Sequence, residues 1–161
     1  MNSSVTKTAG GDCATYCVFR YRGHTFAVTA SCLREVSSSP KFAELPVRSR
    51  GLAGICHLRN EFVPVLRVPV RNESQAKLDE AASKMLTLQG AHGDWGLLAD
   101  EVVAITPLDF TGGPSKYQDE WSAAWLGSTT FREEVVQILD PTGLYRAVED
   151  ELSRSQESSI S

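Results

Sequence analysis

Short runs that alternate apolar and polar residues, or are rich in aromatic and β-branched side chains, recur along the chain between glycine and polar turns. Both patterns are typical of strands rather than helices. They predict strands at residues 16–21, 25–28, 84–88, 95–99, 101–105 and 135–139, and a strand pair at 51–66. We therefore expect an all-β fold with short helices.

The strand pair at Gly51 to Leu66 (GLAGICHLRNEFVPVL) is the most informative stretch. Its first arm opens with two glycines, its second arm is almost wholly apolar, and Arg59 lies at the polar turn between them. Proline lacks a backbone donor, so Pro64 and Pro69 predict a second arm that lies at a sheet edge or ends early. No nucleophile, metal-ligand cluster or phosphate loop lies near this stretch in the sequence. It therefore indicates a docking surface rather than an active site.

Three segments depart from the strand pattern. Residues 29–36 predict a short helical turn with Thr29 or Ser31 as its cap. Aromatic residues spaced by four would form one stripe on a helix: Tyr117, Trp121 and Trp125. Near the C-terminus, Thr142 is expected to cap a last helix whose apolar face carries Leu144, Tyr145, Val148 and Leu152.

The boundaries follow from these elements. We expect a disordered tail at residues 1–12, a folded region at 13–152 with approximate halves 13–78 and 79–152, and a frayed polar tail at 153–161. A polar linker at 71–83 separates the halves. Two groups of short strands with tight turns predict two small β-barrels packed together.

Composition adds limits but no chemistry. The chain has 161 residues, 42% of them hydrophobic and 22% charged, which suits one globular domain with a core. No apolar run approaches the roughly 20 residues that span a bilayer, and no secretory signal is visible at the start. The net charge of -4 divides into +6 for residues 1–78 and -10 for residues 79–161. Such an asymmetry favours head-to-tail contacts with a similar partner.

Catalytic and metal chemistry find little support in the sequence. The four cysteines (Cys13, Cys17, Cys32 and Cys56) are interpreted as reduced, mostly buried thiols, because the chain is long enough to fold without disulfides. No C-x-x-C spacing indicates zinc. Histidines are found near turns, but no nucleophile elbow accompanies them. We expect no enzyme activity, cofactor or metal.

From Tyr16 to about Leu152 the chain resembles the CheW-like domain of bacterial chemotaxis coupling proteins. The family's Gly-Val-x-Asn-Leu-Arg-Gly-x-x-Val-Pro-Val signature corresponds to residues 54–65 (GICHLRNEFVPV), and its apolar-x-Glu-apolar step to residues 33–36 (LREV). A Gly-apolar-apolar-apolar-Asp step recurs at residues 96–100 (GLLAD). The chain departs from the pattern at His57, Asn60 and Arg67, where the family has Asn, Gly and Asp.

The resemblance implies two five-stranded β-barrels that share a hydrophobic interface. It implies a cytoplasmic, non-enzymatic adaptor that couples the cytoplasmic tips of chemoreceptors to the regulatory domain of a CheA-type histidine kinase. The protein would associate with membrane receptor arrays through its partners, without inserting into the membrane. Other CheW-like domains would be further partners, in rings.

Arg59 is the principal candidate for partner binding, because a guanidinium offers five donors in a fixed fork. The resemblance implies that Glu35 lies in the same receptor-binding region and pairs with Arg59. The other candidates are Leu33, Leu58, Gly54, His57 and Asn60. Leu33, Val36, Ile55 and Leu58 could form an apolar groove beside Arg59, although core packing is the commoner role for such residues. Arg59 could equally be a brace for its own hairpin.

An alternative function is binding of single-stranded nucleic acid on a small β-barrel. A basic segment would supply the charge: Arg48, Arg50, Arg59, Arg67 and Arg71. The acidic total and the lack of interleaved aromatic residues argue against it, so we expect no nucleic-acid partner.

Overall fold

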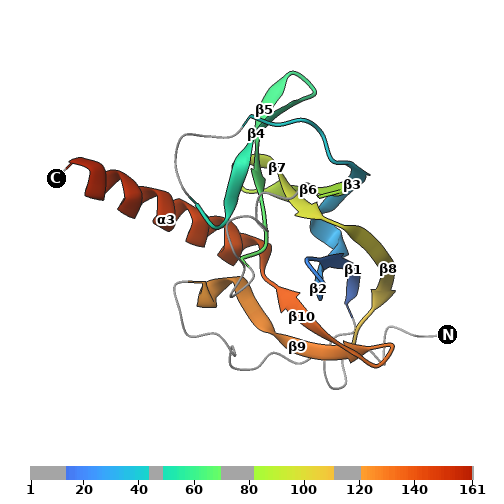
Figure 1. Cartoon of the computed structure of the whole chain (residues 1–161). Coiled ribbons are helices and arrows are strands. Elements are labelled where there is room, and N and C mark those ends of the chain that lie inside the picture. The colour runs from blue at the N-terminus through green and yellow to red at the C-terminus, as the bar shows by residue number, and fades with distance from the viewer. Residues whose placement is uncertain (1–13, 44–48, 70–81, 111–120, 161) are drawn as a thin grey trace.

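The computed structural model of the chain describes residues 14–43, 49–69, 82–110 and 121–160. Within these ranges the strands form two five-stranded sheets, beside which a C-terminal helix runs (Figure 1). The first sheet has the order β8-β1-β2-β10-β9 and the second β3-β6-β7-β5-β4. The strands are β1 (Thr15–Tyr21), β2 (His24–Thr29), β3 (Leu33–Ser38), β4 (Leu52–Leu58), β5 (Glu61–Leu66), β6 (Lys84–Gly90), β7 (Gly93–Ala99), β8 (Glu101–Pro107), β9 (Trp125–Phe131) and β10 (Glu134–Leu139). The helix is α3 (Pro141–Ile160), and two 3-10 turns are η1 (Ala30–Cys32) and η2 (Ser122–Ala124).

The two sheets have the same topology. Replacing each strand by the strand five places away in the chain converts one sheet order into the other. The parallel pairs correspond as well: Ala27 lies opposite Ile138 in the first sheet, and Gly96 lies opposite Val65 in the second. Each sheet takes strands from both sides of residue 78, so the sheets do not follow the division of the chain into residues 13–78 and 79–152.

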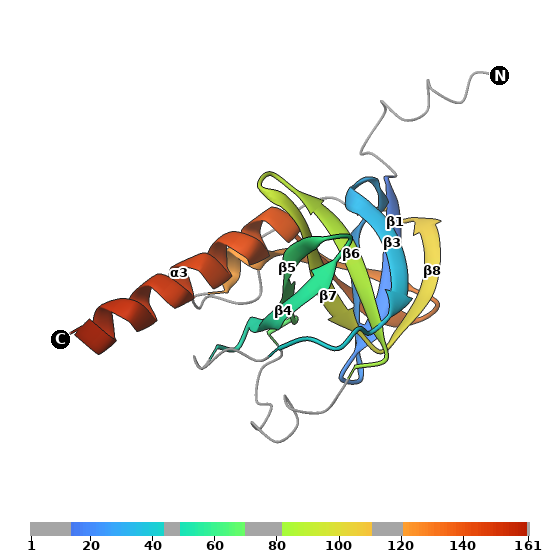
Figure 2. The same cartoon turned by 90° about the horizontal axis from the view of Figure 1, so that it is seen from above.

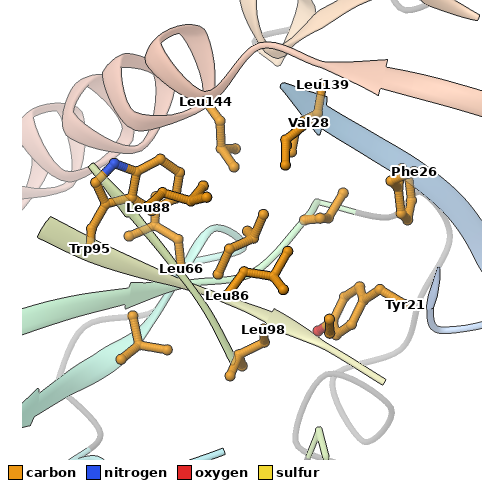
Figure 3. Close-up of a cluster of buried hydrophobic side chains, with 14 of the residues drawn as sticks. Tyr21, Phe26, Val28, Leu66, Leu86, Leu88, Trp95, Leu98, Leu139 and Leu144 are labelled. Atoms are coloured by element: carbon orange, nitrogen blue, oxygen red, sulfur yellow. The ribbon is translucent and has the colours of Figure 1, made fainter. Parts of the chain in front are cut away.

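The main hydrophobic core lies between the two sheets and under α3 (Figure 3). Leu66 and Leu86 come from the second sheet, Val28 and Leu139 from the first, and Leu144 from the helix. Their side chains are fully or almost fully buried, which supplies the hydrophobic stabilisation that joins the sheets. The shared interface that the sequence resemblance implies is therefore present.

The expected barrels are not closed. The first sheet ends at β8 and β9, and the second ends at β3 and β4. In the second sheet the segment after β3 partly covers the open edge, because Ala43 and Ile55 exchange two backbone hydrogen bonds of 2.9 and 3.0 Å. The sheets are thus curled layers with open seams rather than barrels.

The expected helical turn at residues 29–36 is wrong beyond Cys32. Only η1 is helical, Thr29 makes no side-chain cap hydrogen bond, and Leu33 already begins β3. The reason is tertiary: β3 pairs with β6, a strand far away in the sequence, and this pairing overrides the local spacing of Leu33 and Val36.

The aromatic stripe is also wrong as a helix. Trp121 and Trp125 flank the single turn η2, and Trp125 begins β9, a strand that the sequence pattern did not predict. Both rings are buried in the main core. Tyr117 lies outside the described residues.

The terminal helix is confirmed, but both of its ends differ from expectation. Asp140 rather than Thr142 caps its start, because the Asp140 carboxylate accepts a hydrogen bond of 3.2 Å from the backbone N–H of Thr142. The helix continues to Ile160, through the residues expected to fray. Leu144 and Val148 are buried, and Tyr145 and Leu152 pack partly against the core, as the predicted apolar face requires.

The proline argument for β5 is half right. The strand ends at Leu66, before Pro69, but it lies inside the sheet between β7 and β4. It pairs with β7 only at Val65 and Leu66, so the missing donor of Pro64 costs no hydrogen bond to β7. In the described ranges no helix is both apolar and long enough to cross a bilayer.

Candidate functional site

The turn that carries Arg59 has an unusual backbone conformation. Arg59 and Asn60 link β4 to β5 with φ angles of 50° and 66°. Two successive residues in the left-handed region form the tight turn that matches the twist of a hairpin. Asparagine tolerates this region better than most residues. The change from the family's glycine to Asn60 therefore leaves the turn geometry possible.

The Arg59 guanidinium donates a hydrogen bond to a carboxylate oxygen of Glu35. Glu35 belongs to β3 and Arg59 follows β4, and these strands are opposite edges of the second sheet. The ion pair therefore bridges the open seam of the sheet. Its side chains are 58% and 31% exposed, so water screens the pair and its contribution to stability is about 1 kcal/mol or less. Its position suits it to contacts better than to stabilisation.

A second ion pair lies close by on the same edge strand. Arg34 of β3 approaches Asp94 of β7 to 3.4 Å, with both side chains partly exposed. The two pairs connect β3 to both neighbouring hairpins. The predicted pairing of Arg59 with Glu35 is thus found, and a second ion pair is formed by the adjacent residue of β3.

The remaining predicted residues divide into surface and supporting positions. His57 and Asn60 are exposed at the hairpin tip, next to Arg59. Leu33 and Leu58 are half-buried and pack against the main core. Gly54 is buried under the bridge to Ala43, where an added Cβ would overlap the carbonyl oxygen of Ala43. Gly54 therefore shapes the hairpin and offers no side chain to a partner.

The apolar groove expected beside Arg59 is not assembled as one surface. Val36 is 40% exposed, whereas Leu33 and Leu58 face the core. The backbone of Ile55 is hydrogen-bonded to the backbone of Ala43. The sequence interpretation that these residues serve mainly in packing holds for Leu33 and Leu58.

Phe62 is an exposed residue beside Arg59 that the sequence did not indicate as a candidate for partner binding. It is 79% exposed and is the most exposed large hydrophobic residue in the described ranges. Its ring lies 5.2 Å from that of His57, across the same hairpin. The available signal was the alternation of β5, in which Val63 and Val65 point inward and Phe62 therefore points outward.

The thiols in the described ranges are free, and the two buried ones are unsuited to nucleophilic chemistry. Burial raises the pKa of Cys17 from 9.0 to about 11, with a smaller contribution from Cys32. Burial also raises the pKa of Cys56. Only a thiolate is a good nucleophile or metal ligand, so both side chains act as small apolar groups.

The basic segment of the nucleic-acid alternative is not a continuous surface. Arg67 is buried, and its backbone N–H donates to the carbonyl of Gly51. Arg59 is engaged with Glu35. Arg48 and Arg71 lie outside the described residues.

Comparisons with known proteins identify a family and a similar solved structure. The family model of the CheW-like domain matches residues 15–149. The scaffolding protein TtCheW from Thermoanaerobacter tengcongensis has a similar structure, with a TM-score of 0.62 and 18% sequence identity over 82% of this chain and 92% of that chain. The comparison with curated proteins gave no match. The family match covers most of the chain, which therefore belongs to the CheW-like domain family.

Proposed function

We propose that this chain is a chemotaxis scaffold that couples chemoreceptors to a CheA-type histidine kinase through protein contacts. Membership of the CheW-like family supports a scaffold role. A scaffold acts by holding two partners together, which raises their effective concentration and fixes their relative orientation. The kinase would bind through its regulatory domain and the receptor through its cytoplasmic tip.

The observation that carries the receptor site is the exposed ion pair of Arg59 and Glu35 across the seam of the second sheet. An arginine held by a carboxylate is oriented before binding, and it keeps further N–H donors for a partner's carbonyl or carboxylate groups. His57, Asn60 and Phe62 extend this surface along the hairpin tip. We define these five residues as the Arg59 surface.

Assembly and location follow from the same proposal. A protein that contacts receptor tips and a kinase works in the cytoplasm, at receptor arrays, and is held there by its partners. Other CheW-like domains would join it in rings if the head-to-tail rotation closes.

The direct test is formation of the bridged complex. The purified chain is titrated with its cognate kinase's regulatory domain and with a soluble receptor-tip fragment, separately and together, by calorimetry at low salt. We expect binding to each partner and a ternary complex. No complex with the regulatory domain at high micromolar concentration would remove the kinase-coupling proposal.

Charge exchange tests the role of the ion pair. Arg59→Glu should weaken receptor binding by about tenfold or more, which corresponds to about 1.4 kcal/mol. The double variant with Glu35→Arg restores the pair in reversed order. Recovery by the double variant would assign Arg59 an orienting role, whereas continued loss would assign the arginine itself to the partner contact. Unchanged affinity in the single variant would exclude Arg59 from the site.

A further inference from the structure

Two neighbouring cavities lie beside the Arg59 surface and share part of their lining. The larger, of about 120 Å³, lies between the β6–β7 turn and the start of α3. The smaller, of about 90 Å³, lies between that turn and the tip of the β4–β5 hairpin, and Arg59 and Phe62 line it. His92, Gly93 and Tyr145 line both cavities. We call the two cavities together the hairpin–helix groove. Its lining residues lead from Arg59 to the start of α3. Figure 2 shows the ribbon of α3 alongside the β4–β5 hairpin.

The deeper part of the groove has an aromatic floor. Trp95 is almost fully buried, and its ring lies 5.6 Å from that of Tyr145. Gly90 packs against this tryptophan so closely that an added Cβ would come within 3.0 Å of the indole. Gly93, by contrast, faces open space on the Cβ side. The turn therefore keeps the floor in place and leaves an entrance free of side chains.

The size of the larger cavity indicates what it can hold. A cavity of about 150 Å³ in a protein core accommodates a benzene ring. A space of about 120 Å³ with an open entrance fits one leucine or phenylalanine side chain. It is too small for a nucleotide or a folded element.

The charges on the rim of the groove nearly balance one another. Arg59 is paired with Glu35, and Asp94 is paired with Arg34. Arg146 and Glu149 lie three residues apart on α3 and contribute opposite charges to the rim of the larger cavity. Glu61 and His92 complete the set of titratable groups around the groove apart from Tyr145. Nearly balanced charge around an aromatic floor favours an uncharged, apolar side chain.

Phe62 points to a protein as the source of that side chain. Leaving a phenylalanine 79% exposed forfeits most of the hydrophobic stabilisation that its burial would provide. Phe62 lines the smaller cavity, and so does Arg59. A partner seated on the Arg59 surface would cover Phe62 and reach the groove without a break.

We propose that the hairpin–helix groove is a subsite for one bulky apolar side chain, leucine or phenylalanine in size, of the receptor tip that docks at Arg59. The identity of the partner rests on the proposed function, whereas the apolar character of the subsite does not. The bound side chain would lie against Trp95 and Tyr145, with its neighbouring residues over Phe62. Affinity would then depend on an apolar anchor in the groove as well as on the ion pair.

The first test needs no receptor. The ¹⁵N-labelled chain is titrated with N-acetyl-leucinamide and N-acetyl-phenylalaninamide, and with N-acetyl-glycinamide as control. We expect saturable millimolar binding of the first two, with amide shifts concentrated at residues 89–95 and 141–149. Ala91→Trp, which adds bulk at an exposed wall position, should abolish these shifts. Absent shifts, or shifts scattered over both sheets, would overturn the subsite.

The second test uses the receptor-tip fragment. Phe62→Ala and Ala91→Trp should each weaken its binding by about fivefold to twentyfold, as loss of an apolar anchor does. Val135→Ala, in the corresponding hairpin of the first sheet, is the matched control and should bind normally. Equal affinity of all three variants and the original chain would contradict the proposal. Probe binding without any receptor binding would refute the proposed function and leave the apolar subsite supported.

Discussion

The β4–β5 and β9–β10 hairpins have the same backbone and different chemistry. Arg59 and Arg132 occupy the same turn position with φ angles of 50° and 52°, and Asn60 and Glu133 share a φ of 66°. Each hairpin also has a one-residue irregularity at its base, which places Leu52 opposite Leu66 and Trp125 opposite Leu139. The two regions are therefore structural equivalents, within sheets of equivalent topology.

The two hairpins differ in the contacts that their side chains make. Arg59 crosses the seam to Glu35, whereas the guanidinium of Arg132 lies 4.7 Å from the ring centroid of its neighbour Phe131. The position in β8 that corresponds to Glu35 is Ala104, because Ala104 pairs with Val18 as Glu35 pairs with Thr87. A single acidic residue on the edge strand thus decides whether the turn arginine bridges the seam.

The two hairpins are equivalent because each sheet combines strands from both halves of the chain. Cutting the chain between the halves is the severest test of this arrangement. Each sheet needs β1–β2 or β6–β7 from one half and three strands from the other. Fragments 1–80 and 81–161 should therefore be unfolded alone and should assemble when mixed. NMR chemical-shift dispersion of each fragment and of the mixture measures this. A fragment that folds alone would contradict the exchanged topology.

The second prediction concerns Cys17, which occupies the position of Leu86 in the other sheet. Burial raises its pKa from 9.0 to about 11, so the folded state keeps a proton that the unfolded state loses. The contribution of the protonated Cys17 thiol to the unfolding free energy is then fully present below about pH 9. It is lost as pH rises towards 11, which lowers the unfolding free energy by roughly 2–3 kcal/mol.

Urea unfolding between pH 8 and 11 measures this loss. Cys17→Ala should show a shallower decline, because Tyr21 and Tyr145, whose pKa values burial also raises, remain in both proteins. Identical slopes for the two proteins would contradict a buried, protonated thiol at position 17.

Two glycine substitutions test how the second sheet tolerates an added methyl group. An added Cβ at Gly54 would overlap the carbonyl of Ala43, which is backbone, while one at Gly96 would meet the flexible end of Met85. Gly96→Ala copies Ala27 of the first sheet. We expect Gly54→Ala to lower the unfolding free energy by about 1–3 kcal/mol and Gly96→Ala to lower it less. The reverse order in thermal or urea denaturation would show that the backbone at Ala43 can move away from the added Cβ at little energetic cost.

The smallest effect is expected from the turn arginines on stability. Arg59→Ala and Arg132→Ala should each change the unfolding free energy by less than about 1 kcal/mol, because exposed charges are screened. A double-mutant cycle with Glu35→Ala should give a coupling energy of similar size. A loss of several kcal/mol in Arg59→Ala would make the pair a structural brace.

Local signals allowed much of this structure to be predicted, and non-local pairing explains the rest. The hairpin turn at Arg59 and the apolar face of α3 follow from spacing alone. The residues of β3 and β9 carry weak local signals, and they become strands because β6 and β10 pair with them. The partnership of Arg59 with Glu35 came from the family resemblance, since no local pattern joins residues so far apart. Phe62 was missed because an apolar residue in an apolar strand gives no sign of exposure without the alternation.

The affinity of a receptor-tip fragment for Arg59→Ala and Arg132→Ala, measured side by side, shows whether the partner site lies on the hairpin of the second sheet. The two variants remove the same side chain from equivalent turns and should be equally stable. We predict binding about tenfold weaker for Arg59→Ala and unchanged for Arg132→Ala. Equal affinities for the two variants, whether both reduced or both unchanged, would contradict a partner site built on the hairpin of the second sheet.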